Sequence, residues 1–104
     1  MLFRSDEAQA QLQAILANDP ASAGTHEFLG NVFGAKGQRD RAIQQFREAL
    51  RTDPEYARAN LSLGQALVDA GDKAAALPYL RKAAAQDSDV SSRDEAGKLL
   101  DKLK

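Results

Sequence analysis

Apolar residues recur along the chain at spacings of three and four positions, which places side chains on one face of an α-helix. Residues 29–36 follow this pattern, and residues 63–70 repeat it. Residues 42–50 and 76–84 carry a second apolar stripe of the same period. The pattern predicts an all-α chain of about six helices, near residues 4–18, 21–36, 38–51, 55–70, 73–86 and 90–103.

The same order of residue types returns after 34 positions, so that residues 23–56 align with residues 57–90. Repetition at a fixed period is typical of proteins built from stacked helical units, because each unit buries its apolar face against its neighbour. Each copy contains both apolar stripes, so each copy predicts a pair of helices. Eight positions are identical between the copies: Ala23/Ala57, Leu29/Leu63, Gly30/Gly64, Gly37/Gly71, Ala42/Ala76, Arg47/Arg81, Ala49/Ala83 and Asp53/Asp87.

Glycine, aspartate and proline mark the ends of the predicted helices. Gly37 and Gly71 follow the first helix of each copy, and a residue without Cβ readily takes the left-handed conformation of a C-terminal cap. Asp19-Pro20 and Asp53-Pro54 are expected to start the next helices, with Asp as the N-cap and Pro in the first helical position. Asp72 is expected to cap the second helix of the later copy.

Gly30 and Gly64 occupy the same place in the first helix of each copy. Glycine inside a helix costs about 1 kcal/mol relative to alanine, so its return at this place implies a steric advantage. We expect Gly30 to lie opposite Ala42 and Gly64 to lie opposite Ala76, which would let the paired helices approach closely.

Units of 34 residues with Leu-Gly in the first helix, Gly at the turn, and Ala, a large apolar residue and Ala in the second helix resemble the tetratricopeptide repeat family. The resemblance implies a right-handed superhelical array of antiparallel helix pairs, an α-solenoid. The family's frequent Trp in the first helix is replaced by His26 in one copy and by Asn60 in the next. The matching residues are Leu29, Gly30, Phe33, Gly37, Ala42, Phe46, Ala49 and Pro54, then Leu63, Gly64, Leu67, Gly71, Ala76, Leu80 and Ala83.

The resemblance also implies how the chain is divided. We expect a single domain over residues 1–104, in which residues 4–19 match the second helix of a preceding repeat. Residues 23–56 and 57–90 form the two complete repeats, and residues 91–104 form a C-terminal capping helix with one apolar face.

Composition supports a helical globular domain and argues against nucleic-acid binding. The chain has 20 Ala and 13 Leu but only 7 Val, Ile and Thr together, and Ala and Leu are strong helix formers. Its 14 Lys and Arg residues balance 15 Asp and Glu residues, for a net charge of −1. Affinity for nucleic acid depends largely on clustered cations, so no nucleic-acid partner is expected.

The sequence predicts a soluble protein. No apolar run approaches the roughly 20 residues that span a bilayer, so no membrane insertion is expected. The N-terminus lacks the apolar core of a secretory signal. A cytoplasmic location is favoured, and a periplasmic one remains open if the chain is excised from a larger precursor.

Residues that could carry chemistry are scarce. The chain has no Cys and a single His, His26, so we expect no thiolate chemistry, no metal site and no cofactor. Serines lack a neighbouring His that could act as a base. Gly30, Gly34 and Gly37 form a glycine-rich stretch, but no Lys-Ser or Lys-Thr follows it, so it is not a phosphate loop. The sequence therefore predicts a protein that is not an enzyme, with no catalytic residues.

The family's groove positions can be carried over to this chain. They imply a concave face that binds an extended or helical segment of another protein, with apolar anchors and a few hydrogen bonds. Some family members grip a terminal carboxylate, but Glu27 stands where a Lys is needed and Ser62 where an Asn is needed. For two of the positions, Leu61 and Val68, packing on neighbours is the alternative. The expected groove residues are Glu27, Asn31, Arg58, Leu61, Gln65, Val68 and Asp69.

Two alternatives to peptide binding stay open at this level. Repeat arrays have end faces that can stack, so the chain could form a homo-oligomer through the N-terminal half repeat. The half repeat also allows the chain to be an accessory domain cut from a larger multidomain protein.

Overall fold

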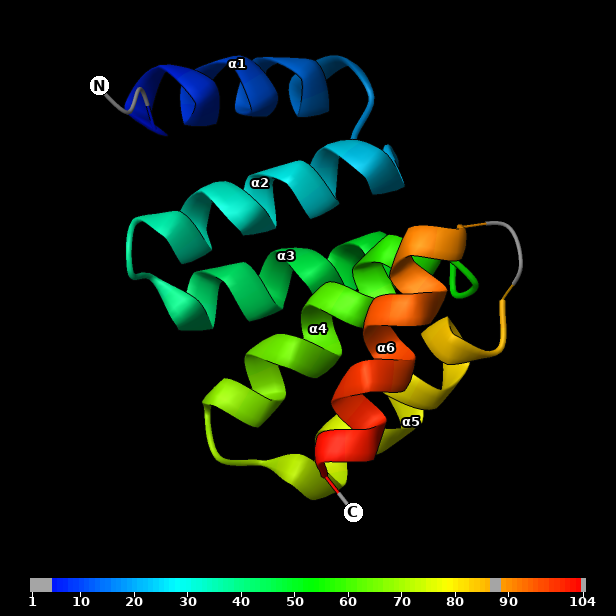
Figure 1. Ribbon diagram of the computed structural model, residues 1–104. Helices are drawn as coiled ribbons and strands as arrows, with labels where there is room; N and C mark the ends of the chain where they lie inside the picture. Colours follow the sequence, from blue (N-terminus) through cyan, green and yellow to red (C-terminus); the bar gives the residue numbers. More distant parts are fainter. Residues whose placement is uncertain (1–4, 87–88, 104) are drawn as a thin grey trace.

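The computed structural model describes residues 5–86 and 89–103, which form six α-helices and no strand (Figure 1). The all-α prediction is confirmed, and each helix lies within its predicted span except that α3 continues to Thr52. None of the helices in the described part is long and apolar enough to cross a bilayer. The helices are α1 (Ser5–Asn18), α2 (Ala23–Ala35), α3 (Arg39–Thr52), α4 (Ala57–Asp69), α5 (Lys73–Ala84) and α6 (Val90–Lys102).

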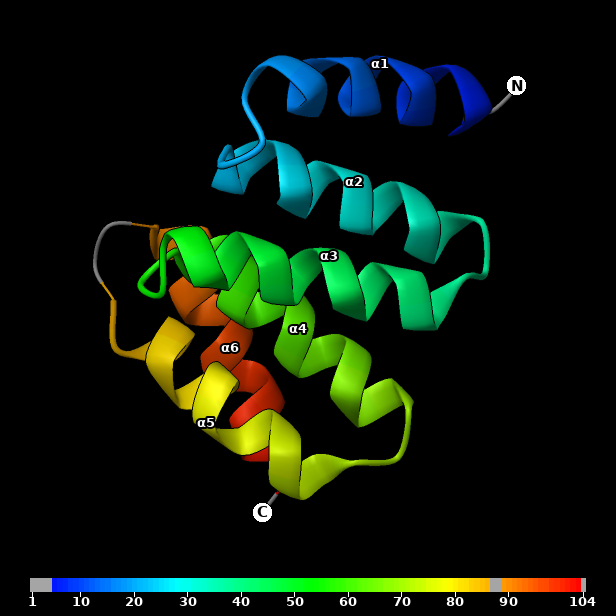
Figure 2. The same ribbon diagram turned by 180° about the vertical axis from the view of Figure 1, so that it is seen from behind.

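The helices stack as hairpins. α2 packs along α3 and α4 along α5, while α1 packs on α2 and α6 packs on both α4 and α5. The views from the two sides show α4 and α6 on one face of the array, and α3 and α5 on the other (Figures 1 and 2). This arrangement is the predicted α-solenoid of helix pairs, with α6 placed where a further repeat would set its first helix.

The core repeats with the sequence. Eight buried residues form one apolar cluster, and every member in the first copy has its counterpart 34 positions later. Ala49 and Ala83 are also fully buried. The eight cluster residues are Leu29, Phe33, Ala42 and Phe46 with their copies Leu63, Leu67, Ala76 and Leu80.

The helical glycines of the two hairpins allow close approach, but toward different neighbours than expected. A Cβ on Gly30 would collide with the ring of Phe46, and a Cβ on Gly64 would lie 2.5 Å from Leu80 Cδ2. The expected partner of Gly64, Ala76, presents only a backbone oxygen, 3.5 Å away. The space that glycine leaves is thus filled by the large core residue of the partner helix.

The turns inside the hairpins match the prediction. Gly37 and Gly71 have φ angles of 77° and 87°, in the left-handed region that glycine adopts at little cost. Asp72 caps α5, because its Oδ1 accepts a hydrogen bond of 3.1 Å from the backbone N–H of Ala75.

The expected role of Asp19-Pro20 and Asp53-Pro54 as helix starts is wrong. The N-cap of α2 is Ser22 and that of α4 is Tyr56, each two residues after the proline. Both aspartates instead close the preceding helix, each donating its backbone N–H to a carbonyl of that helix. The residue before a proline is disfavoured in the helical conformation, so this dipeptide ends a helix more readily than it begins one.

Candidate peptide-binding groove

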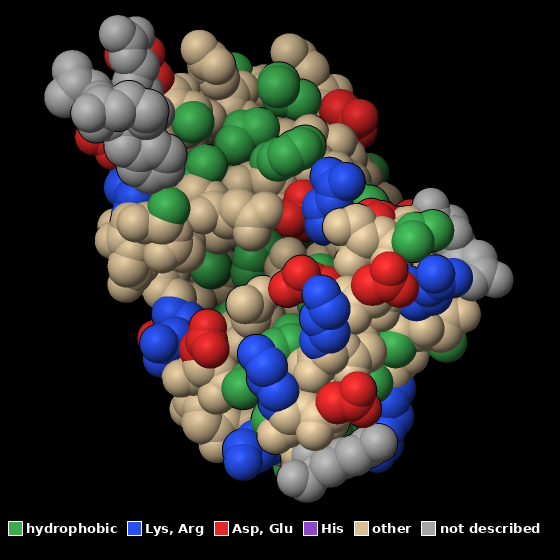
Figure 3. Space-filling view, viewed as in Figure 1, with side chains coloured by type: hydrophobic (Ala, Val, Ile, Leu, Met, Phe, Trp, Pro, Cys, Tyr) green, Lys and Arg blue, Asp and Glu red, His purple; other side chains and the backbone are tan. Residues whose placement is uncertain are grey.

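A cleft of about 570 Å³ lies between α2 and α4, and its floor is formed by the first half of α3 together with Gly34 near the end of α2. The surface is hollowed between these helices on the face seen in Figure 3. First helices of successive repeats form the two walls, as expected for a concave face. The lining residues are Gly30, Asn31, Gly34, Gly37, Arg39, Ala42, Phe46, Ser62, Gln65, Ala66 and Asp69.

Three of the predicted groove residues line this cleft: Asn31, Gln65 and Asp69. Asn31 and Gln65 are exposed carboxamides separated by one repeat length, so they face the cleft from equivalent places on the two walls. An amide can both donate and accept hydrogen bonds, which suits recognition of a polypeptide. Asp69 lies near the C-terminal end of α4 and has no ion pair within the described residues.

Glu27 is placed differently from the expectation of a groove-lining residue, because its side chain is fully buried behind the cleft wall. Asn31 Nδ2 donates a hydrogen bond to its Oε2, and Ser62 Oγ donates another of 3.4 Å. Its other oxygen, Oε1, is buried without a hydrogen-bond partner. Glu27 therefore orients two lining residues and does not itself present a carboxylate to a ligand.

Burial is the main cause of the pKa shifts of Glu27 and Tyr56. Desolvation raises the pKa of Glu27 above its ordinary value, against the hydrogen bond from Asn31 and the charge of Arg58. Burial, followed by the Glu27 charge, also raises the pKa of Tyr56. Arg58 Nη2 lies 3.8 Å from Asp89 Oδ2, an ion pair that is only partly shielded from water.

The remaining predicted groove residues, Arg58, Leu61 and Val68, do not line the cleft. Leu61 and Val68 are half-buried and pack against the central apolar cluster, as do several residues of α6. Arg58 is half-exposed and directed to Asp89 at the start of α6. The start of α6 therefore lies beside the start of α4, where Arg58, one of the predicted groove residues, is located.

A second depression, of about 370 Å³ and mostly apolar, was not predicted. It lies between α1 and α2 and is lined chiefly by Leu12, Ile15, Phe28 and Val32. Ile15 and Phe28 remain 49% and 51% exposed, and the apolar side chains over α1 and α2 gather on the face seen in Figure 3. Asn31 lines both depressions, which makes them neighbours along α2. The sequence contained one indication of this depression: Phe28 is a large aromatic residue outside the apolar stripe that packs into the core.

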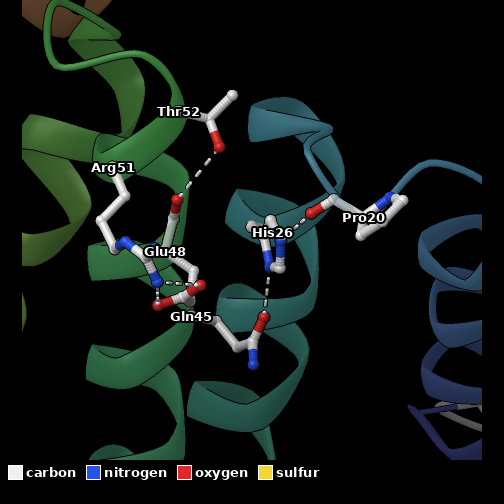
Figure 4. Close-up of polar contacts among 6 residues, drawn as sticks. All are labelled: Pro20, His26, Gln45, Glu48, Arg51 and Thr52. Atoms are coloured by element: carbon white, nitrogen blue, oxygen red, sulfur yellow. Dashed lines mark hydrogen bonds and ion pairs between the residues drawn. The ribbon is translucent and has the colours of Figure 1, made fainter.

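His26 has a structural role. Its Nε2 lies 2.9 Å from the Pro20 carbonyl oxygen, and its Nδ1 lies 2.7 Å from Gln45 Oε1 (Figure 4). The ring therefore ties α2 to the preceding turn and to α3. Nearby, Arg51 Nη1 donates to both carboxylate oxygens of Glu48 on the surface of α3. Within the described residues, no group of three His, Cys, Asp or Glu side chains is arranged to hold a metal ion.

Both the sequence and the structure of this chain are similar to those of known helical-repeat proteins. A family model described as "Tetratricopeptide repeat" matches residues 29–91. A crystal structure of MamA is similar with a TM-score of 0.73 and 26% identity, covering 90% of this chain and 52% of that chain. Another crystal structure of MamA protein gives a TM-score of 0.69 and 26% identity over 90% and 48%. This chain spans about half the length of both, and no curated protein sequence matches it.

Proposed function

Because the chain belongs to the tetratricopeptide repeat family, we propose that it is a non-catalytic scaffold that binds a segment of another protein in its concave groove. The segment lies across α2 and α4, in the cleft that the first helices of the two repeats form. This function needs no cofactor, metal ion or nucleic acid.

One observation carries the proposal: the cleft is open and presents the carboxamides of Asn31 and Gln65 from both walls. A polypeptide segment is an alternating series of amide donors and acceptors, so two amides one repeat apart suit its backbone. The apolar depression next to Asn31, with the half-exposed Ile15 and Phe28, offers an anchor site for a large apolar side chain.

A matched pair of glutamine variants tests the groove. Gln65 is exposed in the cleft on α4, and Gln44 is exposed on α3, which lies on the opposite face (Figures 1 and 2). Peptides selected from a random displayed library on the wild-type chain are measured on both variants. We expect Gln65→Arg to weaken binding by about tenfold or more and Gln44→Arg to leave it unchanged. Equal affinity for both variants would place the binding surface elsewhere.

Self-association through the N-terminal half repeat is a second candidate function. It is favoured by α1, in which no apolar residue is fully buried, and by the exposed Ile15 and Phe28 beside it. Light scattering over a concentration series tests it directly. A molar mass that rises with concentration in the wild type and stays at the monomer value in Ile15→Asp supports self-association; a monomer throughout excludes it.

A further inference from the structure

The buried carboxylate behind the cleft determines what the cleft presents to a ligand. An ionised carboxylate only accepts hydrogen bonds, so Asn31 turns its NH₂ group and Ser62 turns its O–H toward Glu27. Both residues line the cleft, and each commits a donor to Glu27: Ser62 its O–H, and Asn31 one of its two N–H groups. Their acceptors, Asn31 Oδ1 and the remaining lone pairs of Ser62 Oγ, are left for a ligand.

Negative charge adds to this bias. Asp69 lines the cleft without an ion pair in the described part of the chain, and Glu27 Oε1 is buried without a partner close behind the wall. The charge of Arg58 acts on Glu27 and is shared with Asp89, with which Arg58 forms an ion pair. Arg39 is the one cation among the lining residues, and it lies exposed at the start of α3, by the Gly37 turn.

Gly34 is a separate indication that a side chain enters here. Unlike Gly30 and Gly64, it has no packing role, because a Cβ at this place would meet only Ala42 Cβ at 4.0 Å. It has no positive φ angle either. The equivalent residue of the next repeat is Val68. Glycine in a helix is unfavourable without a compensating reason, and the consequence of glycine here is an open cleft floor.

We propose that the cleft between α2 and α4 receives a basic side chain, lysine or arginine, of the bound polypeptide. The aliphatic stem lies on the floor that Gly34 and Ala42 leave open, and the charged group meets the acceptors of Asn31, Ser62 and Asp69. The inference rests on the proposed function, since it names which side chain the groove selects. A long cation with an apolar stem fits a cleft lined by these acceptors better than a carboxylate does.

Small probes test the selectivity on the whole chain. Nα-acetyl-lysine methylamide, its norleucine analogue and its glutamate analogue are titrated while NMR records the side-chain amide signals of Asn31 and Gln65. Norleucine keeps the stem and lacks the ammonium group. We expect saturable shifts with the lysine probe and binding about tenfold weaker with norleucine, the difference that a charge-assisted hydrogen bond supplies.

Two variants locate the binding. Gly34→Leu adds a side chain to the cleft floor, where its Cβ meets only Ala42 Cβ at 4.0 Å, and Gly97→Leu makes the same change on α6, where a Cβ meets nothing within 4 Å. We expect the lysine-induced shifts to disappear in Gly34→Leu and to persist in Gly97→Leu, with both variants folded by circular dichroism. Glu27→Gln should reduce the preference for lysine over norleucine, because it removes the ionisable carboxylate behind the cleft wall while its amide oxygen can still accept from Asn31 and Ser62.

Several results would overturn the inference. Equal binding of lysine and norleucine, tighter binding of glutamate, no shift with lysine, or unchanged binding by Gly34→Leu would each do so. The experiment with library peptides distinguishes failure of this inference from failure of the proposed peptide-binding function. If selected peptides still lose affinity with Gln65→Arg while the lysine probe fails, the groove binds a polypeptide without selecting a basic side chain.

Discussion

His26 Nε2 lies 2.9 Å from the backbone carbonyl oxygen of Pro20, across the turn that joins α1 to α2 (Figure 4). The next repeat makes the same contact with a different residue: Asn60 Nδ2 donates a 3.1 Å hydrogen bond to the Pro54 carbonyl. His26 and Asn60 are both buried. A polar donor that closes the turn onto the first helix therefore replaces the aromatic residue expected from the family resemblance.

His26→Ala should destabilise the protein more than His26→Asn. Alanine leaves the Pro20 carbonyl without its side-chain donor, at a cost of about 1–3 kcal/mol. Asparagine can donate as Asn60 does in the next repeat, so its loss should be about 1 kcal/mol or less. Urea unfolding of the three proteins gives the comparison. Equal losses in the two variants would mean that the contact with the carbonyl contributes nothing.

Two helical glycines should respond to alanine in opposite directions. In Gly64→Ala the new Cβ would lie 2.5 Å from Leu80 Cδ2 in the packed core, a clash that should cost about 1–3 kcal/mol. In Gly34→Ala the Cβ meets only Ala42 at 4.0 Å, so the higher helix propensity of alanine should add about 0.5–1 kcal/mol. Thermal unfolding measures both. Destabilisation by Gly34→Ala would show that this glycine is needed for the fold.

The core was predictable from the sequence because its residues are set by spacing alone. Leu29, Phe33 and Phe46 and their copies are large apolar residues that lie on one face of their helices. Stacking of the repeated units buries this face. The left-handed glycines, Gly37 and Gly71, were predictable for the same reason, since the turn after a helix requires that conformation.

The groove was predictable only in part, because it depends on how neighbouring helices cover one another. Asn31, Gln65 and Asp69 line the cleft, whereas Glu27 on the same helix face is covered and has become buried. A residue spacing identifies the face of a helix but not the depth to which a neighbouring helix, here α4, encloses it. The role of Gly34 was hidden for a similar reason, since only coordinates show that no side chain opposes it.

Loss of the aspartate cap on α5 should destabilise the second hairpin. Asp72→Ala removes the acceptor for the Ala75 N–H, at a cost of about 1 kcal/mol. Asp53→Ala is the control, because Asp53 lies in the Asp-Pro turn before α4 but does not cap that helix. Its side chain accepts only a 3.2 Å bond from the exposed Glu55 N–H, so the change should be smaller. Chemical denaturation of both variants measures the difference, and a larger loss with Asp53→Ala would contradict the cap assignment.

The buried carboxylate of Glu27 should make part of the stability depend on pH. Burial raises its pKa in the folded chain above the value of 4.5 expected for the unfolded chain. Between these two values the folded state binds more protons than the unfolded state, so this group lowers stability as pH rises. Below 4.5 both states are protonated and the group has no effect of this kind.

Glu27→Gln isolates the effect, since it keeps the shape of the side chain and removes the titration. The stability of the variant relative to wild type should be greater at about pH 7 than at about pH 4, because at the higher pH folding of wild type must either bury the Glu27 charge or bind a proton. Urea unfolding of both proteins across this range supplies the difference, in which the other carboxylates cancel. A difference that is flat or grows toward acid would show that Asn31, Ser62 and Arg58 stabilise the ionised form at least as much as burial opposes it.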